Sequence, residues 1–190
     1  MNRNRSPFVI TAAILVALGA LVTYFSGYYV DWLWFQSVDF TDVWTTVLAT
    51  KIQLFLIVGI VTSLIISLNI YIAYKRRPLY VPVSIEVSGL ERLRAQIEPI
   101  RTWVFVGVVA ALTYFAGSSG MVFWREWLLF KNATDFGVTD PQFGLDISFF
   151  AFRLPMWQAI IGWAISTLVL AALASAFIHY MYGGIRTNVQ

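Results

Sequence analysis

Four long apolar runs constrain this chain more than any other feature of its sequence. They extend over residues 7–24, 47–71, 103–123 and 156–180. About 20 predominantly apolar residues in a helix cross a hydrocarbon core of about 30 Å, and a helix satisfies all of its own backbone polar groups there. The sequence therefore predicts an all-α membrane protein, in which residues 1–190 form a single bundle of about four transmembrane helices.

The composition agrees with a membrane protein. The chain is 59% hydrophobic and 12% charged, whereas a soluble domain has about 25% charged residues. The net charge of +3 lies in short basic clusters between apolar runs, which argues against a nucleic-acid partner. The chain has no cysteine, so disulfides and thiol chemistry are excluded. No cofactor or catalytic motif is recognisable, and we expect a protein that is not an enzyme.

The first apolar run follows Arg3 and Arg5, as the core of a secretory signal peptide would. Its length exceeds that of a usual signal core, and the residues that follow it, 24–29, are bulky instead of small as at a cleavage site. We therefore expect a retained helix, with a cleaved signal peptide as the alternative.

The distribution of lysine and arginine predicts the orientation, because basic residues near helix ends stay in the cytoplasm. With the N-terminus inside, the outer segments 25–46 and 124–155 hold only Arg125, Lys131 and Arg153. The inner segments hold Arg3, Arg5, Lys75, Arg76, Arg77, Arg92, Arg94, Arg101 and Arg186. Both termini and the loop 75–102 are thus expected in the cytoplasm, with the protein in the plasma membrane of a bacterium.

The loop 75–102 carries a helix signal. Ser88 and Glu91 have the spacing of a capping box, and Leu90, Leu93 and Ile97 fall on one helical face. We expect a short amphipathic helix over residues 88–98 at the inner leaflet. The candidate contacts to lipid headgroups are Lys75, Arg76, Arg77, Arg92 and Arg94. The alternative is that these residues only hold the loop inside.

Aromatic residues dominate the two outer segments. Residues 28–35 predict an aromatic belt in the headgroup layer, or a docking surface for a lipid or helix. The segment 124–155 is expected to fold over the outer leaflet, with a short interfacial helix near 124–130 and irregular backbone after it. Asp135, Asp140 and Asp146 could bind Ca²⁺, but their spacing is not that of an EF-hand loop, and Asp140-Pro141 is typical of a turn.

Three polar residues within the second apolar run are candidates for intramembrane function: Lys51, Gln53 and Asn69. The stem of Lys51 can extend to the interface, pair with an outer acid such as Asp31, or line a polar pathway. Gln53 and Asn69 most simply form hydrogen bonds between helices. Lys51 and Gln53 lie about 200° apart on a helix, which weakens the pathway.

Small residues mark candidate helix-packing faces, notably Gly19, Gly107 and Ala111. Without side-chain bulk, two helices approach closely enough for van der Waals contact, which drives helix association in lipid. These faces predict a packed bundle and contact with further helices.

Three stretches, residues 31–35, 140–155 and 179–186, resemble uncharacterised protein family 0182. Its members are large bacterial membrane proteins with no agreed activity. The resemblance covers essentially the whole chain, and the pattern D-P-x-F-G-x-D-I-x-F is specific. The chain departs from it at Asp39-Phe40, where the pattern implies Gly-Tyr. It also implies further spans and a large extracytoplasmic domain beyond this N-terminal membrane part.

Two functions remain open from the sequence. In the first, the chain is a membrane subunit or scaffold that contacts lipids and binds other membrane protein subunits, with a hetero-complex favoured. In the second, it is a component of a transporter or a lipid-handling assembly.

Overall fold

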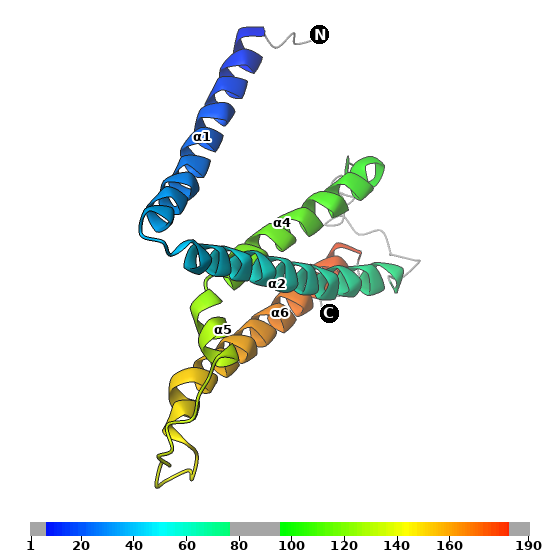
Figure 1. The fold of residues 1–190 in the computed structure, drawn as a ribbon. Helices are drawn as coiled ribbons and strands as arrows, with labels where there is room; N and C mark the ends of the chain where they lie inside the picture. The colour runs from blue at the N-terminus through cyan, green and yellow to red at the C-terminus, as the bar shows by residue number, and fades with distance from the viewer. Residues whose placement is uncertain (1–6, 77–95, 183–190) are drawn as a thin grey trace. The chain divides into compact units, whose positions relative to one another are not determined.

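The protein is mostly helical in the part that the computed structural model describes, residues 7–76 and 96–182 (Figure 1). The helices are α1 (Pro7–Ser37), α2 (Thr41–Lys75), the 3₁₀ turn η2 (Glu98–Ile100), α4 (Arg101–Met121), α5 (Trp124–Lys131), the π-helical turn η3 (Phe149–Arg153) and α6 (Leu154–Met181). Four of them are long and apolar enough to cross a membrane. The predicted all-α membrane bundle is thereby confirmed.

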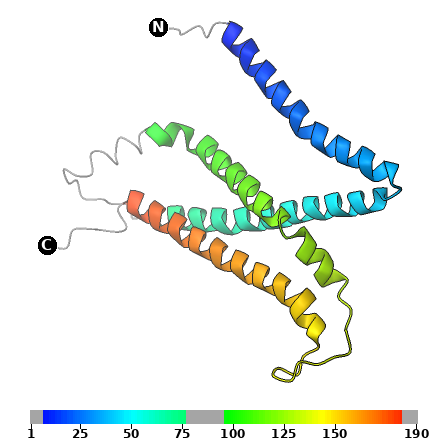
Figure 2. The same ribbon diagram turned by 90° about the vertical axis from the view of Figure 1, so that its left-hand side faces the viewer.

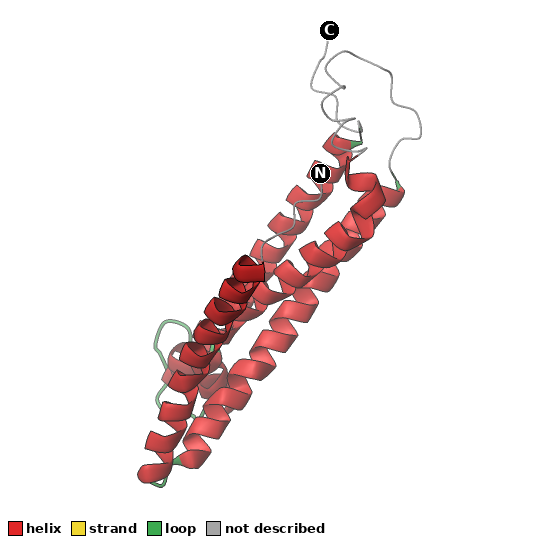
Figure 3. Ribbon diagram, turned by 90° about the horizontal axis from the view of Figure 1, so that it is seen from above, coloured by secondary structure: helices red, strands yellow, loops and turns green. Residues whose placement is uncertain are grey.

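The chain divides into two compact units, Met1–Ala49 and Thr50–Gln190, and each is described by itself. The described residues contain helices and loops and no β-strand, as Figure 3 shows. A single isolated β-bridge joins Thr139 to Asp146.

In the first unit, α1 continues through residues 25–37, so the first part of the segment 25–46 that was expected outside the membrane is helical. α1 has 31 residues, about 46 Å at 1.5 Å per residue, and so exceeds a hydrocarbon core of about 30 Å. The helix continues past the end of the apolar run, because no helix breaker follows Gly27 before the turn. The aromatic residues 28–35 therefore lie on the last turns of a continuous helix.

A Schellman motif ends α1. The Phe40 N–H donates to the Phe35 carbonyl at 2.9 Å, and the Asp39 N–H donates to the Gln36 carbonyl at 3.2 Å. Asp39 has a φ of +63°, a left-handed conformation in which glycine is the usual residue and aspartate one of the few others tolerated. The position where the family resemblance implies glycine thus keeps the conformation that glycine favours.

In the second unit, α2 crosses α4, as Figure 2 shows, and glycines allow this approach. A Cβ atom at Gly117 would lie 2.7 Å from the Phe55 carbonyl oxygen, and one at Gly120 would lie 2.7 Å from Val58. On α2, a Cβ at Gly59 would lie 2.6 Å from the Thr113 carbonyl oxygen. Backbone therefore packs against backbone, which is how helices gain contact energy in lipid.

Polar and aromatic contacts tie α6 to α2 at two levels. The Trp163 indole N–H donates to the Thr62 hydroxyl at 2.8 Å, and Thr62 is buried. At the end of both helices, the rings of Tyr74 and Tyr182 meet edge to face at 5.4 Å. Arg101 at the start of α4 donates to the Tyr74 hydroxyl at 3.2 Å, so three helices meet at this end.

The segment between α4 and α6 begins with the short helix that the sequence predicts. α5 covers Trp124–Lys131 and irregular backbone follows it, which confirms the helix and the irregular backbone; their place at the outer leaflet stays a prediction. The Phe130 ring meets the Trp157 ring edge to face at 6.0 Å, which holds α5 against α6.

Candidate functional site

A cavity of about 530 Å³ lies between the last turn of α4, the first turns of α5 and α6, and α2. Its walls are largely apolar and include Leu54, Val58, Phe123, Met156 and Ile160. The volume falls within the range of about 300–1,000 Å³ that is typical of small-molecule sites. We call this space, which the side chain of Glu126 also lines, the Glu126 cavity.

Helix packing shapes the Glu126 cavity. Gly120 lets α4 approach Val58 of α2, and Trp163, fixed by its hydrogen bond to Thr62, lines the cavity from α6. Gly162 also lines the cavity, and nothing lies within 4 Å of the Cβ position there. Rigid helices on several sides therefore hold the space open.

Glu126 is the one acidic side chain among the residues that line the cavity. It lies in the first turn of α5, where the exposed backbone N–H groups of a helix favour a negative charge. Its Oε2 atom is nonetheless fully buried without a hydrogen-bond partner among the described residues. A buried acceptor without a donor costs about 1–3 kcal/mol or more when charged, so the site favours a ligand that donates a hydrogen bond.

Lys51 lies on α2, one turn before Leu54, which lines the Glu126 cavity. Its ammonium group lies over the Trp124 ring, 5.5 Å from the ring centroid, in the range of a cation–π interaction. The Lys51 side chain thus extends toward α5, where its ammonium group contacts an aromatic ring. The sequence did not predict this partner.

Gln53 and Asn69 are the other two polar candidates of α2. Gln53 is exposed, and Asn69 donates to the Ile65 carbonyl of its own helix at 2.8 Å. This bond lies within α2, and the expected bond of Asn69 to another helix stays a prediction. Neither residue lines the Glu126 cavity.

The predicted packing positions have no close neighbour within their own unit, Gly19 in the first and Gly107 and Ala111 in the second. Nothing lies within 4 Å of a Cβ atom placed at Gly19 or Gly107, and Ala111 is exposed. The small residues that bring helices together here are Gly59, Gly117 and Gly120. Spacing could have identified them, since Thr113 and Gly117 are four apart, as are Gly59 and Ser63, but spacing does not tell which face meets a neighbour.

Two of the candidate lipid-contacting residues, Lys75 and Arg76, are exposed at the end of α2. Arg77, Arg92 and Arg94 lie outside the described residues, as does most of the expected amphipathic helix 88–98. That expectation remains a prediction.

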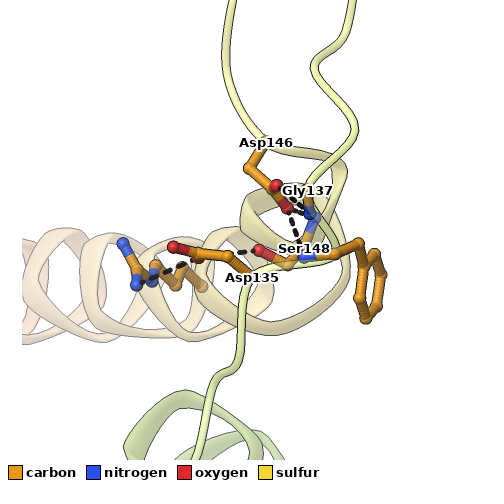
Figure 4. A network of polar contacts seen from close by, with 6 residues as sticks. Asp135, Gly137, Asp146 and Ser148 are labelled. Carbon is orange, nitrogen blue, oxygen red and sulfur yellow. Dashed lines mark hydrogen bonds and ion pairs between the residues drawn. The ribbon is translucent and has the colours of Figure 1, made fainter.

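The loop between α5 and α6, residues 132–148, is held by a carboxylate that accepts backbone hydrogen bonds. Asp146 accepts from the N–H groups of Phe136 at 3.1 Å, Gly137 at 2.8 Å and Ser148 at 2.8 Å (Figure 4). Gly137 has a φ of +73°, which suits a residue without Cβ. The Ser148 hydroxyl, then its backbone N–H and that of Phe136, lower the pKa of Asp146 to about 2.

The other two acids of this loop are also engaged. Asp135 accepts from the Ser148 hydroxyl at 3.2 Å and lies 3.7 Å from the Arg153 guanidinium (Figure 4). Asp140 accepts from the N–H groups of Gln142 at 3.0 Å and Phe143 at 2.7 Å, which confirms the predicted turn at Asp140-Pro141. Within the described ranges, no three His, Cys, Asp or Glu side chains lie close enough together to hold a metal ion.

Sequence reasoning missed Glu126. One signal was available: an acid placed directly after an apolar run, between Trp124 and a second apolar stretch, lies where the hydrocarbon begins. Its burial depends on how α5 folds back against α6, which periodicity does not reveal.

Comparison with known proteins finds a match to the model of Uncharacterised protein family (UPF0182) over residues 8–190. A UPF0182 protein of Streptomyces coelicolor is 38% identical over 98% of this chain and 19% of the relative. One from a Nocardioides species is 44% identical over 96% of the chain and 18% of the relative. The chain thus spans about a fifth of the length of these relatives. No solved structure matches it.

Proposed function

Because the chain belongs to the uncharacterised protein family UPF0182, we propose that it is a non-enzymatic membrane subunit that assembles with the transmembrane helices of a larger UPF0182 protein. One observation carries the proposal: within the second unit, nothing lies within 4 Å of a Cβ atom placed at Gly107 and Ala111 is exposed, on a helix whose other half packs closely against α2. Contact between helices in lipid requires such faces.

The occupant of that face would be a helix from the part of the family proteins outside the matched region. The relatives are about five times longer than the stretch that this chain matches, which leaves ample sequence for further helices. Trp103, in the first turn of α4, is 78% exposed, so a large ring is also available to such a partner.

Co-expression tests this assembly. This chain is tagged and expressed with the part of the Streptomyces coelicolor relative outside the matched region, and the two are extracted in mild detergent. We expect them to co-purify, and Gly107→Ile to weaken co-purification, because the added side chain blocks close approach. Val108→Ile, on another face of the same helix, serves as the matched control. Lack of co-purification with the unaltered chain would refute the proposal.

We also propose that both termini face the cytoplasm in the plasma membrane, on the basis of the lysine and arginine distribution. The chain has no cysteine, so single cysteines can report the side. Thr139→Cys in the loop 132–148 should react with an impermeant thiol reagent on intact cells, and Lys75→Cys should not. The opposite pattern would contradict this orientation.

A second function, the handling of a lipid or solute, is favoured by the Glu126 cavity. The face proposed for assembly and the Glu126 cavity are separate surfaces, because Gly107 and Ala111 do not line the cavity.

A further inference from the structure

We propose that the Glu126 cavity binds one membrane lipid with a primary amine headgroup, whose ammonium group donates to the buried Glu126 carboxylate. The site does not depend on assembly with other helices. Its ligand class follows from three features: the extent of the cavity along α6, the buried acceptor, and the charges at one end.

The extent of the cavity fits one lipid chain. Its α6 lining runs from Pro155 to Ser166, about 16 Å at 1.5 Å per residue. Half of a hydrocarbon core of about 30 Å is about 15 Å. Since the apolar run of α6 begins near Met156, the cavity extends from the interface toward the bilayer centre, the depth of one leaflet.

The acceptor at the interfacial end selects the headgroup. The Oε2 atom of Glu126 is buried without a hydrogen-bond partner, and no lysine, arginine or histidine of the described residues forms an ion pair with Glu126. An ionised carboxylate is an acceptor only, so its partner must bring a donor. An ammonium N–H supplies both the donor and the opposite charge, which makes the strongest type of hydrogen bond.

The surrounding charge fits a zwitterionic phospholipid. Lys51 and Trp124, joined by the cation–π contact, lie at the same end of the helices as Glu126. Lys51 does not line the cavity, so its ammonium offers an opposite charge to a phosphodiester outside the cavity while the amine faces Glu126 inside. The apolar walls formed by Val58, Phe123 and Met156 then receive a hydrocarbon chain.

Native mass spectrometry of the full chain released from nanodiscs tests this assignment. The nanodiscs contain equal parts of phosphatidylethanolamine, phosphatidylcholine and phosphatidylglycerol. We expect one retained phosphatidylethanolamine, since the choline headgroup has the same charge but no N–H and the glycerol headgroup has no amine. Equal retention of phosphatidylcholine would overturn the proposal, and so would retention of phosphatidylglycerol instead.

Variants locate the site. Glu126→Gln should reduce the preference for phosphatidylethanolamine by about tenfold or more, the ratio expected from loss of one charge-assisted hydrogen bond. Glu98→Gln, which removes a carboxylate outside the cavity, should leave the preference unchanged. Gly162→Leu should abolish retention by filling the cavity, since its Cβ position is free of neighbours. If Glu126→Gln leaves the preference unchanged, the carboxylate interacts only with the N-terminus of α5, and the proposal is overturned.

Two further outcomes distinguish other sources of the donor. Addition of ethanolamine alone to the detergent-solubilised chain should not displace the lipid, because it lacks the hydrocarbon chain. If it displaces the lipid at a similar concentration, the site binds a soluble amine, which contradicts a lipid site. If the co-expressed remainder of the relative abolishes lipid retention, a basic side chain of a partner helix occupies the cavity, and the lipid assignment is likewise overturned.

Discussion

The two halves of α4 use small residues in opposite ways. In the half that ends at Met121, Gly117 and Gly120 bring the helix so close to α2 that an added Cβ would meet its backbone or side chains. In the half that begins at Arg101, Gly107 has no neighbour within 4 Å and Ala111 is exposed. One helix thus carries a completed contact and an open face, so a small residue permits close packing but does not show that packing occurs.

The largest expected effect separates these halves directly. Gly117→Leu places atoms against the Phe55 ring and carbonyl and should lower the free energy of unfolding by about 3 kcal/mol, the upper end of overpacking costs. Gly107→Leu should leave stability unchanged or raise it slightly, because leucine is the better helix former. Unfolding of both variants in mixed micelles measures the difference. Equal losses would mean that both halves are packed within the chain.

A smaller effect is expected where α6 joins the packed region. Trp163→Phe removes the donor to Thr62, and Thr62→Val removes the acceptor. Each should cost about 0.6 kcal/mol and at most about 1.7 kcal/mol, the range of hydrogen bonds between membrane helices. The double variant should cost little more than either single variant, because both changes remove the same bond. Fully additive costs from unfolding in mixed micelles would contradict this shared bond.

The same contrast explains which parts of the structure could be predicted from the sequence. Apolar runs predicted the four long helices, because hydrocarbon allows few alternatives to a helix. The short helix α5 was also predicted. The end of α1 was not predicted, because no helix breaker separates the apolar run from the aromatic residues after it. The burial of Glu126 was not predicted, because it depends on how α5 packs against α6. Side-chain periodicity records what one helix presents and does not record what covers it.

The loop 132–148 is held by hydrogen bonds to the Asp146 carboxylate instead of by close contact between helices. Its stability should therefore depend on pH. The pKa of Asp146 is lowered from 3.8 to about 2, so folding favours the ionised carboxylate. The stabilisation is therefore complete above about pH 4 and is lost as the pH falls through 2. The protection of the Gly137 and Ser148 amides against hydrogen exchange, relative to an unstructured chain at the same pH, should fall in that window. Asp146→Asn should show fast exchange at every pH, whereas Asp42→Asn, which removes an exposed acid at the start of α2, should behave as the unaltered chain.

The smallest effect is expected where no packing is involved, in the turn after α1. Asp39 holds a φ of +63°, a conformation that costs most L-residues roughly 1–2 kcal/mol and aspartate less. Asp39→Gly removes this cost but adds freedom to the unfolded chain, so the net gain should be at most about 1 kcal/mol. Asp39→Ala keeps the Cβ atom, which disfavours the left-handed conformation, and removes the polar group that can offset this cost by a local hydrogen bond. It should therefore destabilise the turn. Unfolding in mixed micelles should therefore rank glycine above aspartate and aspartate above alanine. A ranking with alanine first would show that the turn abandons its left-handed residue when free to do so, because alanine favours the right-handed helix.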